Sequence, residues 1–201
     1  MAYGFTTNNW FTVNRNYNIA EFSVSLWAYI PNGSVVRTFA GLWQDSGSLL
    51  QWQVAINGSN QPVFFVYGPG FSGGTATSIS TGNWYNLVMV KTGASLYGYV
   101  NNTKNTFTGQ NSAMTSRAIS FGIGARPDGT NTASSDIAEF ATWTRALTDA
   151  EVASLAKGFK PIRVPKPEIY IPLIRNKVDL SSAYAVTDNG SPTVANHPRV
   201  Y

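Results

Sequence analysis

Hydrophobic and polar residues alternate along most of the chain with a period of two, which is typical of half-buried β-strands. In residues 21–31 the apolar positions that would face a core together are Phe22, Val24, Leu26, Ala28 and Ile30. Similar segments follow at short spacing: 48–58, 61–68, 83–102, 117–125 and 135–144. Strands that follow one another without intervening helices pack as two antiparallel sheets. The pattern therefore predicts an all-β fold, a two-sheet antiparallel β-sandwich.

Turn-forming residues separate these segments. Asn57 and Gly58 would join two strands of one hairpin, and Gly93 would lie in the turn of another. Asn101 and Asn102 tolerate the positive φ that a tight turn requires. Because hairpins join antiparallel neighbours, we expect consecutive strands to pair with each other.

One short helix is predicted near the end of this strand-rich region. Thr148 and Glu151 have the spacing of a capping box, in which each side chain bonds the other residue's backbone amide. Val152 and Leu155 would share the buried stripe, and Gly158 suits the position just after the helix. We expect this helix to cover the end of the sandwich core, and it carries no reactive group.

The chain changes character after the helix. Three prolines would each remove an amide donor and hold the backbone extended over the surface: Pro161, Pro165 and Pro167. Strand-like alternation then returns at Ile169, Ile171 and Leu173. We therefore divide the chain into a sandwich domain of residues 1–158, a proline- and lysine-rich strap of residues 159–167, and a tail of residues 168–201. The tail would complete the sandwich or dock on a partner.

The composition narrows the possible settings. Charged residues make up 12% of the 201 residues, against about 25% in an average domain. Cysteine is absent, so no disulfide holds the fold, and assembly in a reducing cytoplasm is unobstructed. Residues 1–11 show no signal-peptide pattern, and no run approaches the roughly 18 apolar residues of a membrane-spanning helix. We therefore expect no membrane association.

Positive charge is concentrated in one part of the chain. The net charge is +4, and six of the fourteen Lys and Arg residues lie in residues 157–177, where Glu168 is the one acid. This segment lacks the patterns of a nucleic-acid recognition helix or an RNA-binding strand, so we expect no nucleic-acid partner. It is either a solvated basic arm or an arm that docks on an acidic protein surface. The predicted docking residues are Lys160, Arg163, Lys166, Arg175 and Lys177.

Two patterns resemble catalytic sites but lack their context. Residues 70–74 match G-x-S-x-G around Ser72, yet no helix follows, and the single histidine, His197, lies near the end of the chain. Glycoside hydrolysis needs two carboxylates that flank one bond. Asp136 and Glu139 are three residues apart, so on a regular strand their side chains point to opposite faces unless a bulge intervenes. We therefore expect no enzymatic activity.

Ligand sites of other kinds are less constrained. One histidine and no cysteine exclude the usual zinc and iron sites, and we expect no cofactor. A calcium ion, which binds oxygen ligands, is possible at Asp45, Asp128 or Asp136. Aromatic rings that could stack on sugar rings are available at Trp10, Trp27, Tyr29, Trp43 and Trp52.

Residues 134–158 resemble the closing segment of laminin G-like, concanavalin A-like jelly-roll domains. The matching positions are Ile137, Glu139, Trp143, Arg145, Ala146, Leu147, Thr148, Glu151 and Val152. Ala138 stands where these domains usually have aspartate, so a metal or ligand role does not carry over to this edge. Residues 22–31 and 84–102 resemble two further strand segments of the family, and the resemblance covers about residues 3–158. It implies a jelly-roll sandwich with one short helix on its C-terminal side.

The tail adds a second resemblance. Residues 170–182 are similar to a phrase that opens the N-terminus of many such domains, which implies a permuted order of strands. The layout from residue 146 onward is similar to laminin G-like proteins of tailed bacteriophages. This resemblance implies a non-enzymatic virion structural protein, assembled in the host cytoplasm and located on the capsid surface as a decoration or cement protein. Its partners would be the major capsid protein or other virion proteins, and sister copies in a homo-oligomer such as a trimer.

Two other functions remain open. The chain could be a carbohydrate-binding adhesion module of a tail or fibre that uses its aromatic residues to bind glycans. A glycoside hydrolase is the third and least favoured, because the carboxylate pair is poorly placed.

Overall fold

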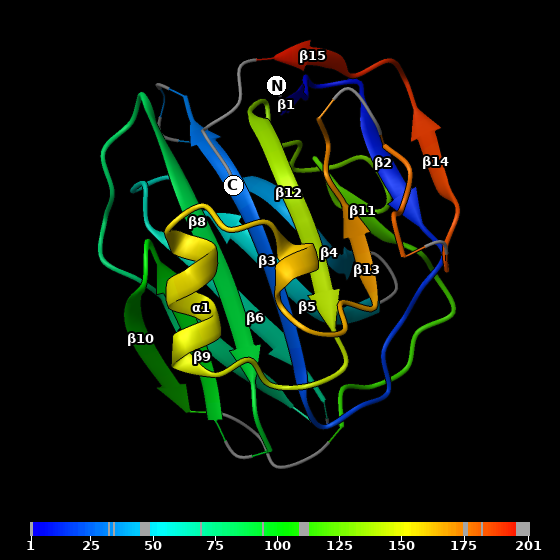
Figure 1. Cartoon of the computed structure of the whole chain (residues 1–201). Coiled ribbons are helices and arrows are strands. Elements are labelled where there is room, and N and C mark those ends of the chain that lie inside the picture. The colour runs from blue at the N-terminus through cyan, green and yellow to red at the C-terminus, as the bar shows by residue number, and fades with distance from the viewer. Residues whose placement is uncertain are drawn as a thin grey trace.

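The structure is a computed structural model, and it describes residues 2–31, 33, 35–44, 49–68, 70–93, 95–108, 113–174, 177–181 and 183–195. Two antiparallel sheets pack face to face, as the alternation predicts (Figure 1). One sheet has eight strands: β1 (Ala2–Gly4), β3 (Phe22–Ile30), β8 (Asn83–Lys91), β9 (Ser95–Val100), β10 (Thr103–Thr108), β12 (Asp136–Trp143), β13 (Ile169–Ile171) and β15 (Thr193–Ala195). The other has seven strands: β2 (Trp10–Val13), β4 (Arg37–Gln44), β5 (Leu49–Ile56), β6 (Pro62–Tyr67), β7 (Phe71–Thr75), β11 (Phe121–Ile123) and β14 (Val186–Asn189).

Strand order explains how the layers close. The eight-stranded sheet runs β10-β9-β8-β3-β12-β1-β15, with β13 paired to β12. The seven-stranded sheet runs β14-β2-β11-β4-β5-β6-β7. The predicted hairpins β5–β6, β8–β9 and β9–β10 all pair antiparallel. Asn101 and Asn102 have φ angles of 46° and 70°, which confirms the tight turn between β9 and β10.

The core lies between the two sheets. The predicted inward positions of β3 are confirmed, since all five are fully buried: Phe22, Val24, Leu26, Ala28 and Ile30. Trp52 of β5 packs on Phe22 of the facing sheet and on Phe121 of β11 in its own sheet, with ring centroids 5.3 and 5.4 Å away. Each such side chain stabilises the fold by about 1.5–3 kcal/mol through burial.

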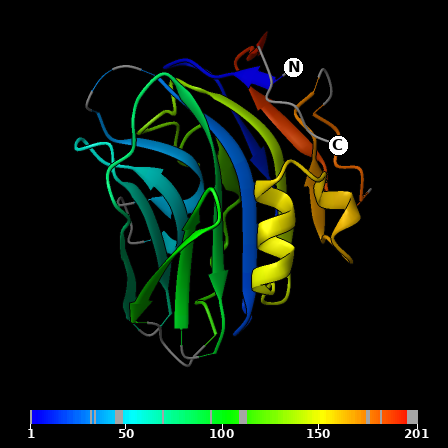
Figure 2. The same cartoon turned by 60° about the vertical axis from the view of Figure 1, so that its left-hand side comes forward.

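Helix α1 (Asp149–Ala156) has both parts of the predicted capping box, formed by Thr148 and Glu151. Gly158 takes a positive φ of 87° after the helix, as its position predicts. The expected location was wrong, because α1 lies on the outer face of the eight-stranded sheet and not over the end of the core (Figure 2). The cause is that the outward residues of β8, β9 and β12 are also apolar. They form a second cluster with Val152 and Leu155 of the helix: Val88, Val90, Tyr99, Ala141 and Trp143.

The segment predicted as an extended strap contains a single turn of 3-10 helix, η2 (Pro161–Arg163). Its first residue is proline, whose fixed φ and missing amide are tolerated at the start of a helix. The amide of Arg163 donates to the carbonyl of Lys160, and the amide of Val164 donates to that of Pro161. The prolines therefore bend this segment into a compact turn beside α1.

The tail supplies strands to both sheets. Strand β13 pairs with β12, β14 with β2, and β15 with β1. Between β13 and β14, the carboxylate of Asp179 is 2% exposed and accepts hydrogen bonds from the amides of Tyr170, Ser181, Ala183 and Tyr184. These bonds hold the tail loop against the sheet.

The two outer faces of the sandwich differ. The outer face of the eight-stranded sheet carries α1, η2 and the chain that leads into β13 (Figures 1 and 2). The described residues place no helix on the outer face of the seven-stranded sheet. Within the same residues, no helix has the length and apolar character needed to cross a bilayer.

Candidate functional site

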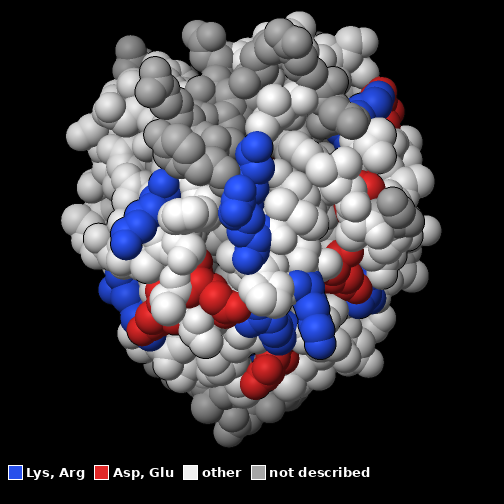
Figure 3. All heavy atoms as spheres, viewed as in Figure 1, with Lys and Arg blue, Asp and Glu red and all other residues white. Residues whose placement is uncertain are grey.

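Three of the predicted docking residues lie on one short segment beside α1. Lys160 precedes η2, Arg163 ends it, and Lys166 follows it, while Lys157 at the end of α1 adds a fourth cation. Figure 3 shows basic side chains over the centre of this face. No ion pair joins these four cations to an acid among the residues that the structure describes.

Of the other two predicted docking residues, the structure describes Lys177, which does not join this group. Lys177 forms an ion pair with Asp188 of β14 and lies 6.0 Å from the ring of Phe11, so it contacts a different part of the sandwich. Arg175 falls outside the described residues. The structure therefore brings together Lys160, Arg163 and Lys166.

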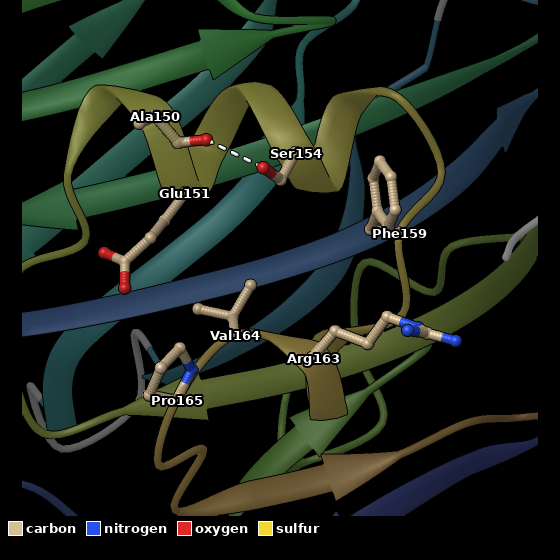
Figure 4. Close-up of a pocket in the computed structure, with 7 residues that line it drawn as sticks. All are labelled: Ala150, Glu151, Ser154, Phe159, Arg163, Val164 and Pro165. Atoms are coloured by element: carbon tan, nitrogen blue, oxygen red, sulfur yellow. Dashed lines mark hydrogen bonds between the residues drawn. The ribbon is translucent and has the colours of Figure 1, made fainter.

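A groove lies between α1 and η2, and we call it the α1–η2 groove. Its volume is about 390 Å³, and its lining residues are Ala150, Glu151, Ser154, Phe159, Arg163, Val164 and Pro165. Figure 4 shows Phe159 and Arg163 at one end of the groove, and Glu151 and Pro165 at the other. Phe159 is 43% exposed, and the neighbouring Ile162 is 54% exposed. Exposed apolar side chains grouped beside cations are typical of a contact surface.

The acidic side chain in this groove is already paired. Arg145 donates two hydrogen bonds to the carboxylate of Glu151, at 2.9 and 2.7 Å, and one to the carbonyl of Pro165 at 2.9 Å. The hydrogen bond from Arg145 is the largest cause that lowers the pKa of Glu151 to about 2. The groove wall is therefore fixed and locally neutral, and the charge that remains around it is positive.

A second depression lies on the uncovered outer face of the seven-stranded sheet, and we call it the open-face groove. Its volume is about 480 Å³, and its lining residues are Thr12, Asn14, Gln44, Ala118, Ile119, Ser120, Pro127 and Asn189. They come from β2 and the residue after it, from β4 and β14, and from the segments before and after β11. Every polar side chain in this set is an uncharged amide or hydroxyl, which can both donate and accept hydrogen bonds.

Strand register explains why few side chains project from the centre of this outer face. Cα partners form one continuous row across the seven strands: Thr187, Thr12, Gly122, Gly41, Gln53, Phe65 and Gly73. Paired residues project to the same face of a sheet, so two of the central positions carry no side chain. A Cβ at Gly41 would lie 2.7 Å from the carbonyl oxygen of Trp52, which leaves no room for a larger residue.

An aromatic cluster continues this face beyond the groove. The ring centroid of Trp43 lies 5.7 Å from that of Phe65 and 6.0 Å from that of Phe71. The centroids of Phe65 and Phe71 are 4.5 Å apart. Phe71 is 52% exposed. Trp43 immediately precedes Gln44 of the groove, so the aromatic cluster and the groove share strand β4.

Of the five predicted sugar-stacking residues, Trp10 of β2, Trp43 of β4 and Trp52 of β5 belong to the seven-stranded sheet, whereas Trp27 and Tyr29 of β3 belong to the eight-stranded sheet. Trp52 is fully buried in the core and is excluded as a platform. Within the eight-stranded sheet, Tyr29 packs on Trp84. The ring of Trp10 lies against Gly129. Phe65 and Phe71 were missed in the sequence, although Phe65 alternates with the buried residues of β6.

Asp136 and Glu139, the carboxylate pair predicted to point apart, lie on β12, where a β-bulge interrupts the strand. The register of β12 against β3 shifts between Ala138 and Ala141, and Glu139 has a φ of 54°. The assumption of a regular strand was therefore wrong at this point. Glu139 is 1% exposed, and its carboxylate accepts a 2.6 Å hydrogen bond from the hydroxyl of Tyr170. Burial, followed by this hydrogen bond, raises the pKa of Tyr170. Glu139 thus lies buried beside β13, next to Tyr170.

Of the other candidate catalytic and metal residues, the structure describes Ser72 and Asp128. Ser72 lies inside β7, where the strand continues, so it does not form the strand-to-helix turn of a nucleophile elbow. His197 and Asp45 fall outside the described residues. Asp128 accepts hydrogen bonds from the amide and hydroxyl of Thr130, as a turn residue does. The described part of the chain contains no group of three or more His, Asp or Glu side chains that could hold a metal ion.

Comparison with known proteins identifies the fold. A laminin G family model described as the concanavalin A-like lectin/glucanases superfamily matches residues 5–153. The search of curated proteins gave no match. Among solved structures, a candidate carbohydrate-binding protein from Bacteroides ovatus is similar with a TM-score of 0.75 and 15% identity, over 97% of this chain and 61% of that one.

Two toxin binding domains are also similar. The binding domain of Paraclostridial Mosquitocidal Protein 1 gives a TM-score of 0.58 and 13% identity, over 72% of this chain and 40% of that one. The binding domain of botulinum neurotoxin serotype G gives 0.54 and 15%, over 70% and 37%. The chain thus spans less than two thirds of each of these three structures. At identities this low, the structural similarity shows a shared fold and nothing more.

Proposed function

Because the chain belongs to the concanavalin A-like lectin/glucanases superfamily, as its closing segment predicts, we propose that it is a non-enzymatic binding protein whose open-face groove binds a carbohydrate. The observation that carries this proposal is the uncharged amide and hydroxyl lining of the groove beside the aromatic cluster. The carbohydrate-binding description of the Bacteroides ovatus protein supports the same reading.

Sugar chemistry suits this surface. A sugar ring presents hydroxyl groups at its rim and apolar C–H groups on its faces. Asn14, Gln44 and Ser120 could exchange hydrogen bonds with the hydroxyls. The half-exposed ring of Phe71 could pack against an apolar face. Since no charged residue lines the groove, the proposed ligand is a neutral glycan.

The catalytic alternative is disfavoured by geometry. Glycoside hydrolysis needs a carboxylic acid and a carboxylate on either side of one bond. Glu139 is buried and bound to Tyr170, so it is not available to a bound polysaccharide. This supports a binding role over a hydrolytic one.

A glycan array followed by titration calorimetry tests the proposal. We expect saturable binding of a neutral glycan, weakened about two- to tenfold by Asn14→Ala through the loss of one hydrogen-bonding group. Phe71→Ala should also weaken it, through the loss of an apolar contact. Phe159→Ser, on the opposite outer face, is the matched control and should leave binding unchanged. Absence of glycan binding, or binding that survives both groove variants, would reject the proposal.

The second candidate is a virion structural protein of a tailed bacteriophage, decorating the capsid exterior. The tail resemblance suggests it, and the cations around the α1–η2 groove supply a surface for an acidic capsid protein. Exposed ion pairs contribute about 0.2–1 kcal/mol each, so Phe159 and Ile162 would have to supply much of the affinity. The partners would be the major capsid protein and sister copies in a homo-oligomer such as a trimer.

Copy-number mass spectrometry of purified virions separates this candidate from the first. A decoration protein should be present in many copies on each particle. Its absence from particles, or presence in only a few copies, would remove the decoration role. A few copies together with glycan binding would point to an adhesion module of a tail or fibre.

A further inference from the structure

The rim of the α1–η2 groove has an excess of positive charge. Residues 145–166 contain five cations and two acids. Arg145 is paired with Glu151, and Asp149 is paired with Lys104 of β10. The remaining cations are Lys157, Lys160, Arg163 and Lys166, which no acid compensates among the described residues. A ligand that fits this rim carries negative charge.

The interior of the groove is apolar and fixed in place. Phe159 follows Gly158, and its amide donates to the carbonyl of Ser154, which sets its position at the end of the helix. The turn bond to Pro161 fixes Val164, and Arg145 holds the carbonyl of Pro165. Because these groups are already ordered, a ligand would bind without the entropic cost of arranging them.

We propose that the α1–η2 groove binds an acidic protein segment that places one bulky apolar side chain against Phe159. The inference uses the same surface as the second candidate function, but it does not require the partner to be a capsid protein. A volume of about 390 Å³ lies within the range of ligand pockets. Aspartate and glutamate on either side of the apolar residue would meet Arg163 and Lys160.

A peptide chain matches this surface better than a nucleic acid does. Phosphates would satisfy the cations but would leave the apolar interior, with Phe159, Val164 and Pro165, without a matching group. A protein segment offers carboxylates and an apolar side chain within a few residues. Since the cations are largely exposed, their attraction should weaken as salt rises, with a screening length of about 8 Å at physiological ionic strength.

The test begins with a displayed library of random peptides selected against the whole protein. We expect enrichment of peptides that combine several Asp or Glu residues with Leu, Phe or Trp. The tightest peptide is then synthesised with a fluorophore and titrated by anisotropy. Arg163→Gln should weaken its binding about two- to fivefold, as removal of one exposed ion pair does. Phe159→Ser should weaken it about tenfold or more.

Lys177→Gln is the matched control, because it removes the same charge from a different part of the sandwich. It should leave the peptide affinity unchanged, and circular dichroism should show that all three variants are folded. The inference is overturned if the enriched peptides lack acidic residues, or if the Arg163 and Phe159 variants bind them as well as the wild type does. It is also overturned if no peptide is enriched while phosphatidylserine vesicles bind the wild type but neither variant, which would assign the surface to a membrane. Glycan binding should persist in these variants, so failure here is distinguishable from failure of the first proposed function.

Discussion

Replacing Asp179 with asparagine tests how firmly the tail is held against the sandwich. One carboxylate oxygen accepts from the amides of Tyr170 and Ser181 at 2.9 and 3.0 Å. The other accepts from the hydroxyl of Ser181 at 2.6 Å and from the amides of Ala183 and Tyr184 at 3.2 Å. Asparagine has nearly the same shape, but its NH₂ group would face these donors.

The expected cost follows from the bonds that are lost. In either orientation of the asparagine amide, two backbone N–H donors lose their acceptor, and the remaining oxygen loses its negative charge. A hydrogen bond to a charged group contributes about 1.5–3 kcal/mol, and bonds that share one acceptor are not additive. Because Asp179 is almost fully buried, water cannot replace the lost partner. We expect Asp179→Asn to lower the free energy of unfolding by about 3 kcal/mol.

Urea denaturation followed by tryptophan fluorescence measures this change. The thermal midpoint should fall by about 6–12 °C, given 2–4 °C per kcal/mol for a domain of this size. Asp188→Asn is the control, because it makes the same chemical change at a half-exposed carboxylate and should cost less than about 1 kcal/mol. A loss below 1 kcal/mol for Asp179→Asn would refute the view that this carboxylate holds the tail.

Three further outcomes can be measured in the same way. The pKa of Glu151 lies at about 2, below its ordinary value, so its contribution to stability is present above pH 4.5 and is lost as the pH falls toward 2. The stability difference between wild type and Glu151→Gln should therefore narrow over that interval. Gly98→Ala should lower the free energy of unfolding by about 1–3 kcal/mol, because its Cβ would lie 2.3 Å from the ring of Phe64. Gly82→Ala is the comparison: its Cβ would have nothing within 4 Å, so the loss of about 1–2 kcal/mol should come from backbone strain alone. Tyr17→Phe should cost about 1 kcal/mol, because it removes the buried hydrogen bond to Thr142 without changing the packing.

Local patterns in the sequence were sufficient for much of the fold. The inward positions of β3 follow from a period of two, and the capping box of α1 follows from Thr148 and Glu151. The turn at Asn101 and Asn102 depends on the conformations those two residues tolerate. Each of these features is decided by neighbours within a few residues, so a single sequence contains the necessary information.

Features that depend on distant partners were harder to predict. The placement of α1 depends on apolar residues that point outward from three strands. An alternation pattern does not show whether such outward residues are covered by another element or only half-buried. The bulge at Glu139 depends on β1, β3 and β13 pairing along the same strand. The open-face groove depends on register across β14, β2, β11 and β4, which lie far apart in the chain. Sequence reasoning therefore named Trp43 but not its partners Phe65 and Phe71.

The pairing of β1 with β15 and of β2 with β14 has a consequence for biosynthesis. The ribosome makes β1 and β2 first, yet their edge partners lie in residues 186–195. Both sheets therefore keep an unpaired edge until residues 186–195 have emerged. Contacts between such distant residues form slowly, and unpaired edges invite association with other nascent chains. A lowered growth temperature weakens hydrophobic association between such chains and should consequently improve the recovery of soluble protein.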